Sequence, residues 1–518
     1  MEPTLYSIHI KNFKSLCDTG EIEFRPITLL VGPNSSGKTA VLQTLLMLKQ
    51  TLESRNLETP LVLRGKYVNL GSFRDVIFRH ELDKVLEISL GIGVKTAKKS
   101  LIRLRTTKTL HSVSKYAKIS FRIGYDPETD RLVHQGLELS SDGSKLLCLS
   151  DVIKFEHDGL TGEYELEGKK RLPKRNFLFF IPLTMHVVFD EVQHLMDRKK
   201  HLEDTLARFE KKKLELEKLF ERTQRKNVEK ELRRLAGMVE SLKAELSYYE
   251  KRLRRLPKHL SLDQLLILGE LLTLLRRASS HLQDFIIERL YYIGPLREYP
   301  HRYYVASGEY PRDVGLRGEH TADVIYSDFK KRHEQYNNLR KWIKRMGLAE
   351  DLKMKRVAEG LYALVIGDPK LGIDVNLADI GFGASQLLPI LVQGIYAKDN
   401  SVLLIEQPEI HLHPRVQAML ADFFIDIAKQ RKQLIVETHS EHLLLRLQRR
   451  IAEGKFSSDD LAIYFFETTE EGTHISKVNV TEDGIIEEWP KGFFEEDIEE
   501  SYRLLKALGE RRKSVSSD

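Results

Sequence analysis

The sequence is poor in cysteine and has no long hydrophobic run. Its 518 residues include two cysteines, Cys17 and Cys148, and no stretch approaches the roughly 18 uninterrupted apolar residues of a membrane span. Two cysteines are too few for a disulfide framework and lack metal-ligand spacing, so we interpret them as buried apolar thiols in a reducing cytosol. The first residues also lack a charged segment followed by an apolar run. We therefore expect neither a signal peptide nor contact with a membrane, and a cytoplasmic protein.

Positive charge is concentrated in one segment. The chain carries a formal net charge of +6, and residues 198–258 contain 20 Lys and Arg against 11 Asp and Glu, an excess of 9 that leaves −3 for the rest. This segment also has helical hydrophobic spacing. Apolar residues in its second half step by three and four, as in a coiled-coil seam: Leu232, Leu235, Val239, Leu242, Leu246, Tyr249 and Leu253.

The first half of the segment is similar but less regular, and a polar stretch near Arg222–Asn227 separates the two halves. The simplest arrangement is an antiparallel coiled-coil hairpin. Two interpretations of its charge stay open. The hairpin could bind nucleic-acid phosphates through its basic residues, or it could hold two subunits or another protein together, because Lys and Glu are ordinary at outer heptad positions.

A complete phosphate-binding motif lies near the N-terminus. The pattern G-x-x-x-x-G-K-[ST] is matched by Gly32, Pro33, Asn34, Ser35, Ser36, Gly37, Lys38 and Thr39. An apolar run, Ile27–Val31, precedes it and helically spaced leucines follow it, whereas a glycine turn that merely starts a helix does not need Lys-Thr at this spacing. Backbone N–H groups can cradle phosphates there, while Lys38 reaches the β and γ phosphates and the Thr39 hydroxyl ligates Mg²⁺.

A second candidate segment is SVLLIEQPEIHLHP, residues 401–414. Its apolar run leads directly into Glu406, Gln407 and Glu409, as expected where a buried parallel strand ends at a ligand-binding crevice. His411 and His413 follow. A zinc site is a poorer interpretation of these histidines, since H-x-H without a nearby Cys or further His supplies too few ligands.

Two further segments add phosphate-binding potential. Residues 379–389 form a glycine–serine–glutamine loop with Gly383, Ser385 and Gln386 at the start of an apolar helix, where free N–H groups suit a γ-phosphate. The strand-like Gln433–Glu437 is followed by Thr438 and His439.

In this order, the motifs resemble the ABC-type ATPases of the SMC, RecF and OLD group. More narrowly, GPNSSGKTAVLQTLLMLKQ, GFGASQLLPI, IEQPEIHLHP and ETHSEHLLLRL look like the prokaryotic AAA-type ATPases that include the Septu anti-phage ATPase subunit PtuA. The resemblance covers the first 60 residues and the chain from about Ile293 onward. It implies an α/β fold, a P-loop ABC-type ATPase head of mixed sheet, flanking helices and β subdomain, with the coiled-coil hairpin inserted.

The resemblance also implies roles for single residues. Glu406 would hold Mg²⁺ together with Thr39, and His439 would contact the γ-phosphate. Gln407 stands where such proteins usually carry a catalytic glutamate. Because glutamine can orient water but cannot take its proton, this residue implies slow hydrolysis.

Two heads of this group sandwich ATP between the P-loop of one subunit and the glycine–serine loop of the other. The resemblance therefore implies a homodimer or higher homo-oligomer, in which Gly383, Ser385, Gln386 and His411 face the partner's nucleotide. The spacing of Gly383 and Ser385 departs from the common L-S-G-G-Q pattern, which leaves open which of them meets the γ-phosphate.

We divide the chain into six segments: a P-loop part (1–60), a β-rich part (61–188), the hairpin (189–258), a helical connection (259–330), a lobe with the signature loop, Glu406 strand and His439 (331–470), and a C-terminal extension (471–518). The predicted function is a slowly hydrolysing ATPase that regulates a DNA-linked nuclease or toxin in anti-phage defence or DNA maintenance. The alternatives are an ATP-gated coiled-coil DNA clamp without an effector and the ATPase subunit of a transporter.

Overall fold

The computed structural model describes residues 5–54, 59–93, 116–141, 144–149, 152–157, 160–165, 183–253, 262–306, 311–331, 334–367 and 372–488, together with residues 490 and 503. The chain divides into two compact units. Unit 1 contains residues 1–95, 115–135 and 281–518, and unit 2 contains residues 96–114 and 136–280. Within the described ranges, no helix is both long and apolar enough to cross a membrane.

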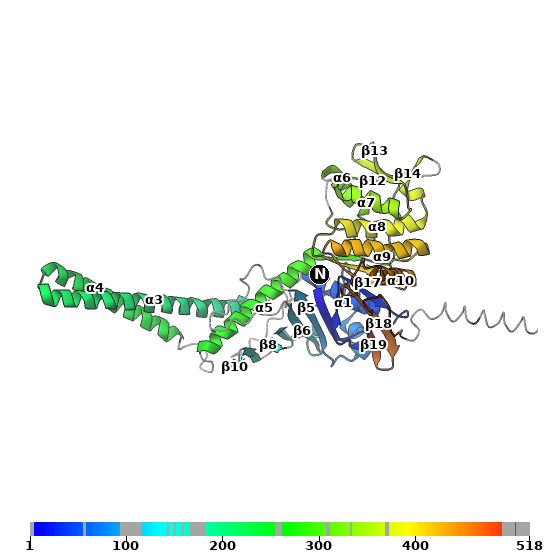
Figure 1. Ribbon diagram of the computed structural model, residues 1–518. Helices are drawn as coiled ribbons and strands as arrows, with labels where there is room; N and C mark the ends of the chain where they lie inside the picture. Colours follow the sequence, from blue (N-terminus) through cyan, green and yellow to red (C-terminus); the bar gives the residue numbers. More distant parts are fainter. Residues whose placement is uncertain are drawn as a thin grey trace, which may run out of the picture. The chain divides into compact units, whose positions relative to one another are not determined.

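The central sheet of unit 1 is parallel except at one edge. Its strands lie in the order β11-β16-β17-β4-β18-β19, with β19 antiparallel to β18. Their bounds are β4 Ile27–Val31, β11 Leu290–Ile293, β16 Val402–Glu406, β17 Gln433–Glu437, β18 Leu461–Thr469 and β19 Gly472–Val478. Every residue of β4, β16 and β17 is buried, which explains their continuous apolar sequences. Figure 1 labels β17, β18 and β19 of this sheet, in the orange of the C-terminal part of the chain.

Helices cover this sheet and enclose its core. The helices that follow the central strands are α1 Lys38–Glu53, α9 Pro414–Lys429 and α10 Glu441–Ala452, and a short 3-10 helix, η3 Ser458–Asp460, precedes β18. Phe423 of α9 is fully buried and meets the Trp342 ring edge-on, with the ring centres 5.2 Å apart. A truncation of such a ring to alanine typically costs about 3–5 kcal/mol.

A small helical and β layer continues unit 1 beyond α9. It contains the helices α6 Thr321–Lys331, α7 Glu334–Arg345, α8 Phe382–Tyr396 and η2 Leu377–Asp379, and the strands β12 Tyr304–Val305, β13 Asp351–Ala358, β14 Leu361–Gly367 and β15 Asp374–Asn376. These strands pair antiparallel around β14 (Figure 1). Buried Lys432 donates to the carbonyls of Gly394 and Ile395 at 2.8 and 2.9 Å, and so satisfies the C-terminal turn of α8.

Unit 1 also contains a group of antiparallel strands, in addition to the sheet that includes the P-loop strand. It contains β1 Leu5–Phe13, β2 Leu16–Asp18, β3 Ile22–Glu23, β5 Leu86–Gly93 and β6 Tyr116–Asp126, with the short helices α2 Phe73–Val76 and η1 Phe78–His80. Cys17 is exposed on β2. The expectation of a buried thiol at Cys17 was therefore wrong, because β2 is a three-residue edge strand with only Leu16 facing the core. The side chain of Cys148 lies outside the described residues.

Unit 2 contains a β-rich part and long helices. The strands β7 Arg131–Ser141, β8 Ser144–Leu149, β9 Val152–His157 and β10 Leu160–Glu165 pair antiparallel in sequence order, with β7 starting in unit 1. The helices are α3 Leu183–Thr223, α4 Lys226–Leu253 and α5 Leu262–Arg289, of which α5 ends in unit 1. The helices α3 and α4 lie side by side (Figure 1), and ion pairs Arg198–Glu245 and Glu210–Lys243 join them at 3.1 and 2.8 Å. Their coiled-coil packing stays a prediction.

Candidate functional site

The P-loop joins β4 to α1 and requires glycine at two positions. Gly32 has a φ of 137°, and a Cβ there would lie 2.2 Å from the carbonyl oxygen of Phe466. Gly37 precedes α1 with a φ of 100°, and its Cβ would lie 2.5 Å from Thr473 Oγ1. Residues with a side chain rarely adopt these φ values, and here they would also clash. The predicted strand and helix on either side of the loop are confirmed.

Lys38 is folded back over this loop. Its side chain is buried, and Nζ donates to the carbonyl oxygens of Gly32 at 2.9 Å and Pro33 at 2.6 Å. Burial lowers the pKa of Lys38, and the carboxylates of Glu437 and Glu409 partly oppose this effect. The ammonium group is therefore held next to the loop whose N–H groups suit phosphate.

The hydroxyl of Thr39 binds a carboxylate that the sequence did not single out. Thr39 Oγ1 donates to Glu437, at 3.1 Å from Oε1 and 2.9 Å from Oε2. Glu437 ends β17, the strand next to β4. Burial raises its pKa, whereas the bond from Thr39 and the charge of Lys38 lower it. The signal that could have indicated Glu437 is a carboxylate at the end of an apolar strand, just before Thr438 and His439.

Glu406 ends β16 and lies in register with Glu437 on the neighbouring strand. Its Oε1 accepts a 3.0 Å hydrogen bond from Tyr292 Oη, and its main-chain oxygen accepts one from Arg297 Nη2 at 2.9 Å. The pKa of Glu406 is raised to about 7, first because burial disfavours the charged form and then because Glu437 carries the same charge. In this conformation the partner of Thr39 is thus Glu437, while Tyr292 bonds to Glu406.

Gln407 directly follows β16 and has a left-handed backbone conformation. Its φ is 43°, its N–H donates to the Glu437 carbonyl at 2.8 Å, and its own carbonyl accepts from the Ile410 N–H at 3.3 Å. A non-glycine residue in this region is strained, and such strain concentrates at functional sites. The turn therefore directs the chain after Glu406 past the end of β17.

Glu409 fixes the loop that contains His439. One carboxylate oxygen of Glu409 accepts from Thr438 Oγ1 at 2.8 Å and the other from the His439 N–H at 2.6 Å. Burial raises the pKa of Glu409. Glu409 therefore has a positioning role in the structure.

Two buried polar atoms near the P-loop have no hydrogen-bond partner among the described residues. They are Ser36 Oγ and His439 Nε2. Burial lowers the pKa of His439, and the charge of Lys38 lowers it further, which favours a neutral ring. Buried polar atoms of this kind call for an explanation. A phosphate group fits both, since a hydroxyl and an imidazole N–H can donate to its oxygens.

The residues of the glycine–serine–glutamine loop, Gly383, Ser385 and Gln386, contact other parts of unit 1. A Cβ at Gly383 would lie 2.9 Å from the carbonyl oxygen of His411, so the two loops approach closely. His411 is exposed and has a φ of 60°. Ser385 is buried, and Gln386 is 1% exposed with its amide bonded to the main chain of Arg297. The structure therefore places Gly383 beside His411, and Gln386 against the main chain of Arg297.

A divalent ion at this edge would draw on few protein ligands. No group of three or more His, Cys, Asp or Glu that could hold a metal is present in the described part of the chain. Thr39 and the end of β16 supply hydroxyl and carboxylate oxygens. Mg²⁺ is commonly held by one or two carboxylates together with phosphate oxygens and waters, which suits this donor set.

Two family models match parts of the chain. A model described as an AAA ATPase domain matches residues 4–444. The chain belongs to the AAA ATPase domain family. A second model, described as a protein of unknown function (DUF3696), matches residues 456–501. No curated protein matches the chain. Family membership makes the chain an ATP-binding ATPase and agrees with the P-loop geometry above.

Solved structures similar to this AAA ATPase domain protein include heads of SMC proteins. An Smc head with an extended coiled coil from Pyrococcus furiosus, bound to the C-terminal domain of ScpA, is 11% identical, with 98% of this chain and 100% of that chain covered and a TM-score of 0.37. The SMC head from Thermotoga maritima is 10% identical, with coverages of 92% and 99% and a TM-score of 0.37. The Smc head from Pyrococcus yayanosii is 12% identical, with coverages of 92% and 98% and a TM-score of 0.38. At these scores the likeness adds nothing to the functional assignment.

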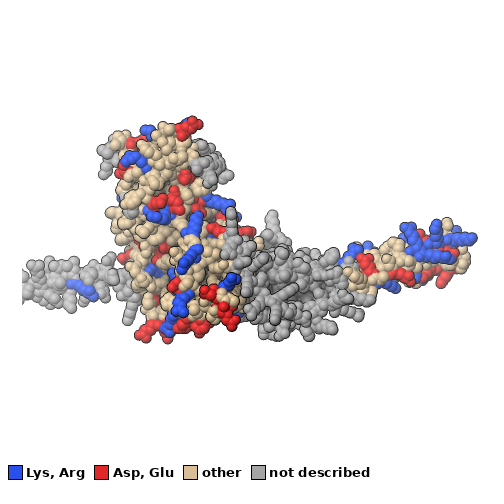
Figure 2. Space-filling model, turned by 180° about the vertical axis from the view of Figure 1, so that it is seen from behind, with Lys and Arg blue, Asp and Glu red and all other residues tan. Residues whose placement is uncertain are grey.

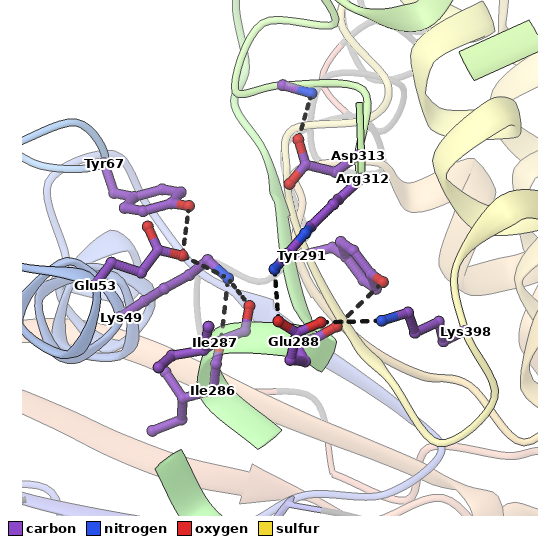
Figure 3. A network of polar contacts seen from close by, with 11 residues as sticks. Lys49, Glu53, Tyr67, Ile286, Ile287, Glu288, Tyr291, Arg312, Asp313 and Lys398 are labelled. Atoms are coloured by element: carbon purple, nitrogen blue, oxygen red, sulfur yellow. Dashed lines mark hydrogen bonds and ion pairs between the residues drawn. The ribbon is translucent and has the colours of Figure 1, made fainter. Parts of the chain in front are cut away.

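The P-loop helix of the AAA ATPase domain has a second anchor at its far end. Lys49 Nζ donates to the carbonyls of Ile286 and Ile287 at 3.1 and 3.0 Å, and pairs with Glu53 at 3.4 Å (Figure 3). Tyr67 Oη donates to the same Glu53 at 3.1 Å. A lysine that satisfies the last carbonyls of a helix stabilises its C-terminus. Lys49 therefore holds the end of α5 against α1.

Neighbouring residues hold the end of α5 from the other side. Figure 3 shows Glu288 between Arg312 and Lys398, and the Lys398 contact measures 3.0 Å. Tyr291 Oη donates to the Glu288 carbonyl at 3.3 Å. Since α5 leads directly into β11, these contacts fix the strand that carries Tyr292 towards Glu406.

Proposed function

We propose that this chain binds Mg²⁺–ATP at Gly32–Thr39 and hydrolyses it slowly. The carrying observation is that Lys38, Thr39, Glu406 and Glu437 converge at the carboxyl ends of β4, β16 and β17. In parallel α/β sheets ligands bind at this edge. Lys38 and the loop N–H groups would hold the phosphates, and Thr39 with Glu406 would hold Mg²⁺. A bound Mg²⁺ neutralises charge that develops on the phosphoryl oxygens.

The site residues divide the remaining work. Gln407 would orient the attacking water, and His439 would donate to the γ-phosphate through the nitrogen that has no partner among the described residues. Without a general base at residue 407, the proton has no fast route from the water. General-base catalysis is commonly worth about 10²–10⁴-fold in rate, so we expect a low turnover number.

ATP binding by Lys38 variants tests this proposal. Lys38→Ala should abolish binding of a fluorescent ATP analogue, because the phosphates lose their ammonium partner. The control is Lys14→Ala, which removes a half-buried lysine that donates to Gln43 of α1. Lys14→Ala should bind normally. Tight binding by Lys38→Ala would refute the site assignment.

We further propose that two heads of the ABC type dimerise around nucleotide and pass that state to a nuclease or toxin. The support is that the segment of Gly383 closely approaches the loop of His411, and His411 is exposed. ATP-dependent dimerisation can be measured by light scattering. Gly383→Val, which adds bulk where a Cβ already meets the His411 carbonyl, should prevent it without lowering monomer affinity for ATP. The six-segment division of the chain is part of the same proposal.

A second candidate is an ATP-gated DNA clamp that uses an antiparallel coiled-coil hairpin of α3 and α4. Figure 2 shows Lys and Arg side chains gathered on the coloured part of these helices, beside Asp and Glu side chains. Full-length protein with Lys211, Lys212 and Lys218 changed to Glu should bind duplex DNA more weakly and with a shallower salt dependence. The control is the same triple change at exposed Lys341, Lys429 and Lys477. Equal DNA binding by the two triple variants would favour the effector hypothesis.

A further inference from the structure

Arg297 is a buried cation that uses little of its hydrogen-bonding capacity. Its residue exposure is 3%, and Nη2 donates to the main-chain oxygen of Glu406 at 2.9 Å. Nε and Nη1 are buried without a hydrogen-bond partner among the described residues. Guanidinium groups normally bind acceptors through a fork of N–H groups. A side chain kept only for structure would be expected to satisfy more of that fork.

The main chain of Arg297 is held by α8. Gln386 Oε1 accepts from the Arg297 N–H at 3.3 Å, and Gln386 Nε2 donates to the Arg297 carbonyl at 3.1 Å. Both residues are almost fully buried. Gln386 lies near the start of α8, three residues after Gly383. A displacement of the start of α8 would therefore act directly on the backbone of Arg297.

The groups that face the guanidinium are acidic or phenolic. The charge of Glu409 acts on Arg297 most strongly, followed by Tyr292 and Glu406. Burial lowers the pKa of Arg297 to about 10, which still leaves it charged at neutral pH. Glu409 is the carboxylate that binds the Thr438 hydroxyl and the His439 N–H. The side chain of Arg297 thus lies between the start of α8 and the loop that contains His439.

We propose that Arg297 is a positioning residue. It couples the start of α8 to the proposed ATP site at the carboxyl ends of β4, β16 and β17, through the Glu406 main chain and the carboxylate of Glu409. This inference rests on the proposed ATPase site. Nε–H and Nη1–H have no hydrogen-bond partner among the described residues, so they are the donors available to the carboxylate of Glu409, whose charge acts on Arg297. Arg297 then determines where Glu409 holds His439. It need not touch nucleotide itself, so it should affect turnover and leave affinity nearly unchanged.

Variants at residues 297 and 386 test this coupling. Arg297→Met keeps the length but loses the charge and the fork, and should lower kcat by about tenfold or more while the Kd for ATP stays within about threefold. Arg297→Lys keeps the charge and should recover part of kcat. Gln386→Leu should also lower kcat, and the double variant should be little worse than Arg297→Met, since both changes remove one pathway. Circular dichroism at the assay temperature ensures that only folded variants are compared.

The outcomes separate this inference from the proposed function. A normal kcat in Arg297→Met, or additive losses in the double variant, would overturn the coupling. If Lys38→Ala binds ATP normally, the proposed function fails instead. In that case the coupling can still be tested by measuring unfolding temperatures without nucleotide. Arg297→Met and Gln386→Leu should be non-additive there, and additive shifts in unfolding temperature would overturn it as well.

Discussion

Thr39 Oγ1 donates a hydrogen bond to the carboxylate of Glu437, at 2.9 Å from Oε2 and 3.1 Å from Oε1. The two residues are far apart in sequence and lie at the ends of adjacent elements, α1 and β17. In the proposed site this hydroxyl is also a metal ligand. Because the hydroxyl donates its proton to Glu437, the lone pairs of its oxygen stay available to Mg²⁺, and Glu437 orients them.

Thr39→Val tests the role of this hydroxyl. The change keeps the shape of the side chain but removes the Mg²⁺ ligand, so we expect hydrolysis to fall by about tenfold or more. The measurement is phosphate release over a Mg²⁺ titration. Thr44→Val on the same helix is the control, because its hydroxyl only donates to the Ala40 carbonyl at 2.9 Å. Equal rates for the two variants would contradict the metal assignment.

Gln407→Glu should increase turnover. It adds a general base at the residue whose backbone already turns past β17 with a φ of 43°, and we expect a gain of about 10²-fold. Single-turnover hydrolysis measures it. Gln224→Glu is a matched control, because Gln224 also has a positive φ, of 46°, between α3 and α4. An unchanged or lower rate in Gln407→Glu would mean that Gln407, or a neighbour such as Glu409, already performs the chemistry.

The raised pKa of Glu406 predicts a pH-dependent stability. Its folded-state pKa of about 7 exceeds the ordinary 4.5, so between these values the folded protein binds more protons than the unfolded chain. Stability without nucleotide should then fall as pH rises, with a contribution from Glu406 of about 3 kcal/mol at most. Urea unfolding of the wild type and Glu406→Gln at pH 5 and pH 8 measures this. The variant should lose less stability, although Glu409 and Glu437 still contribute in the same direction.

Lys49→Met should destabilise unit 1 without removing the ATP site. It leaves the carbonyls of Ile286 and Ile287 without their buried donor, at an expected cost of about 1–3 kcal/mol. Urea unfolding gives the free energy, and ATP affinity is measured in parallel. Lys66→Met is the control, since Lys66 lies over the same Tyr67 ring but is exposed. Equal stability of the two variants would show that the Lys49 contacts contribute little.

Several features of the site could be predicted from sequence because they are local. Gly32 and Gly37 follow from a loop that needs positive φ, and the buried strand before Glu406 follows from its continuous apolar run. The partner of Thr39 could not be predicted, because it depends on strand order. Since β17 lies between β16 and β4, Glu437 is nearer to α1 than Glu406 is. The exposure of Cys17 was likewise missed, because it depends on the edge position of β2.

The sequence alone determined the chemical groups of this protein: a phosphate-binding loop with Lys38 and Thr39, carboxylates after apolar strands, and Gln407 directly after Glu406. Backbone conformation and residue type act over a few positions, so these features can be read along the chain. Only the tertiary structure decided the pairing of Thr39 with Glu437, the attachment of His439 to Glu409 and the burial of Arg297 beside Gln386. Those contacts depend on which strands lie side by side, and that order minimises the free energy of the whole packed sheet rather than of any one segment.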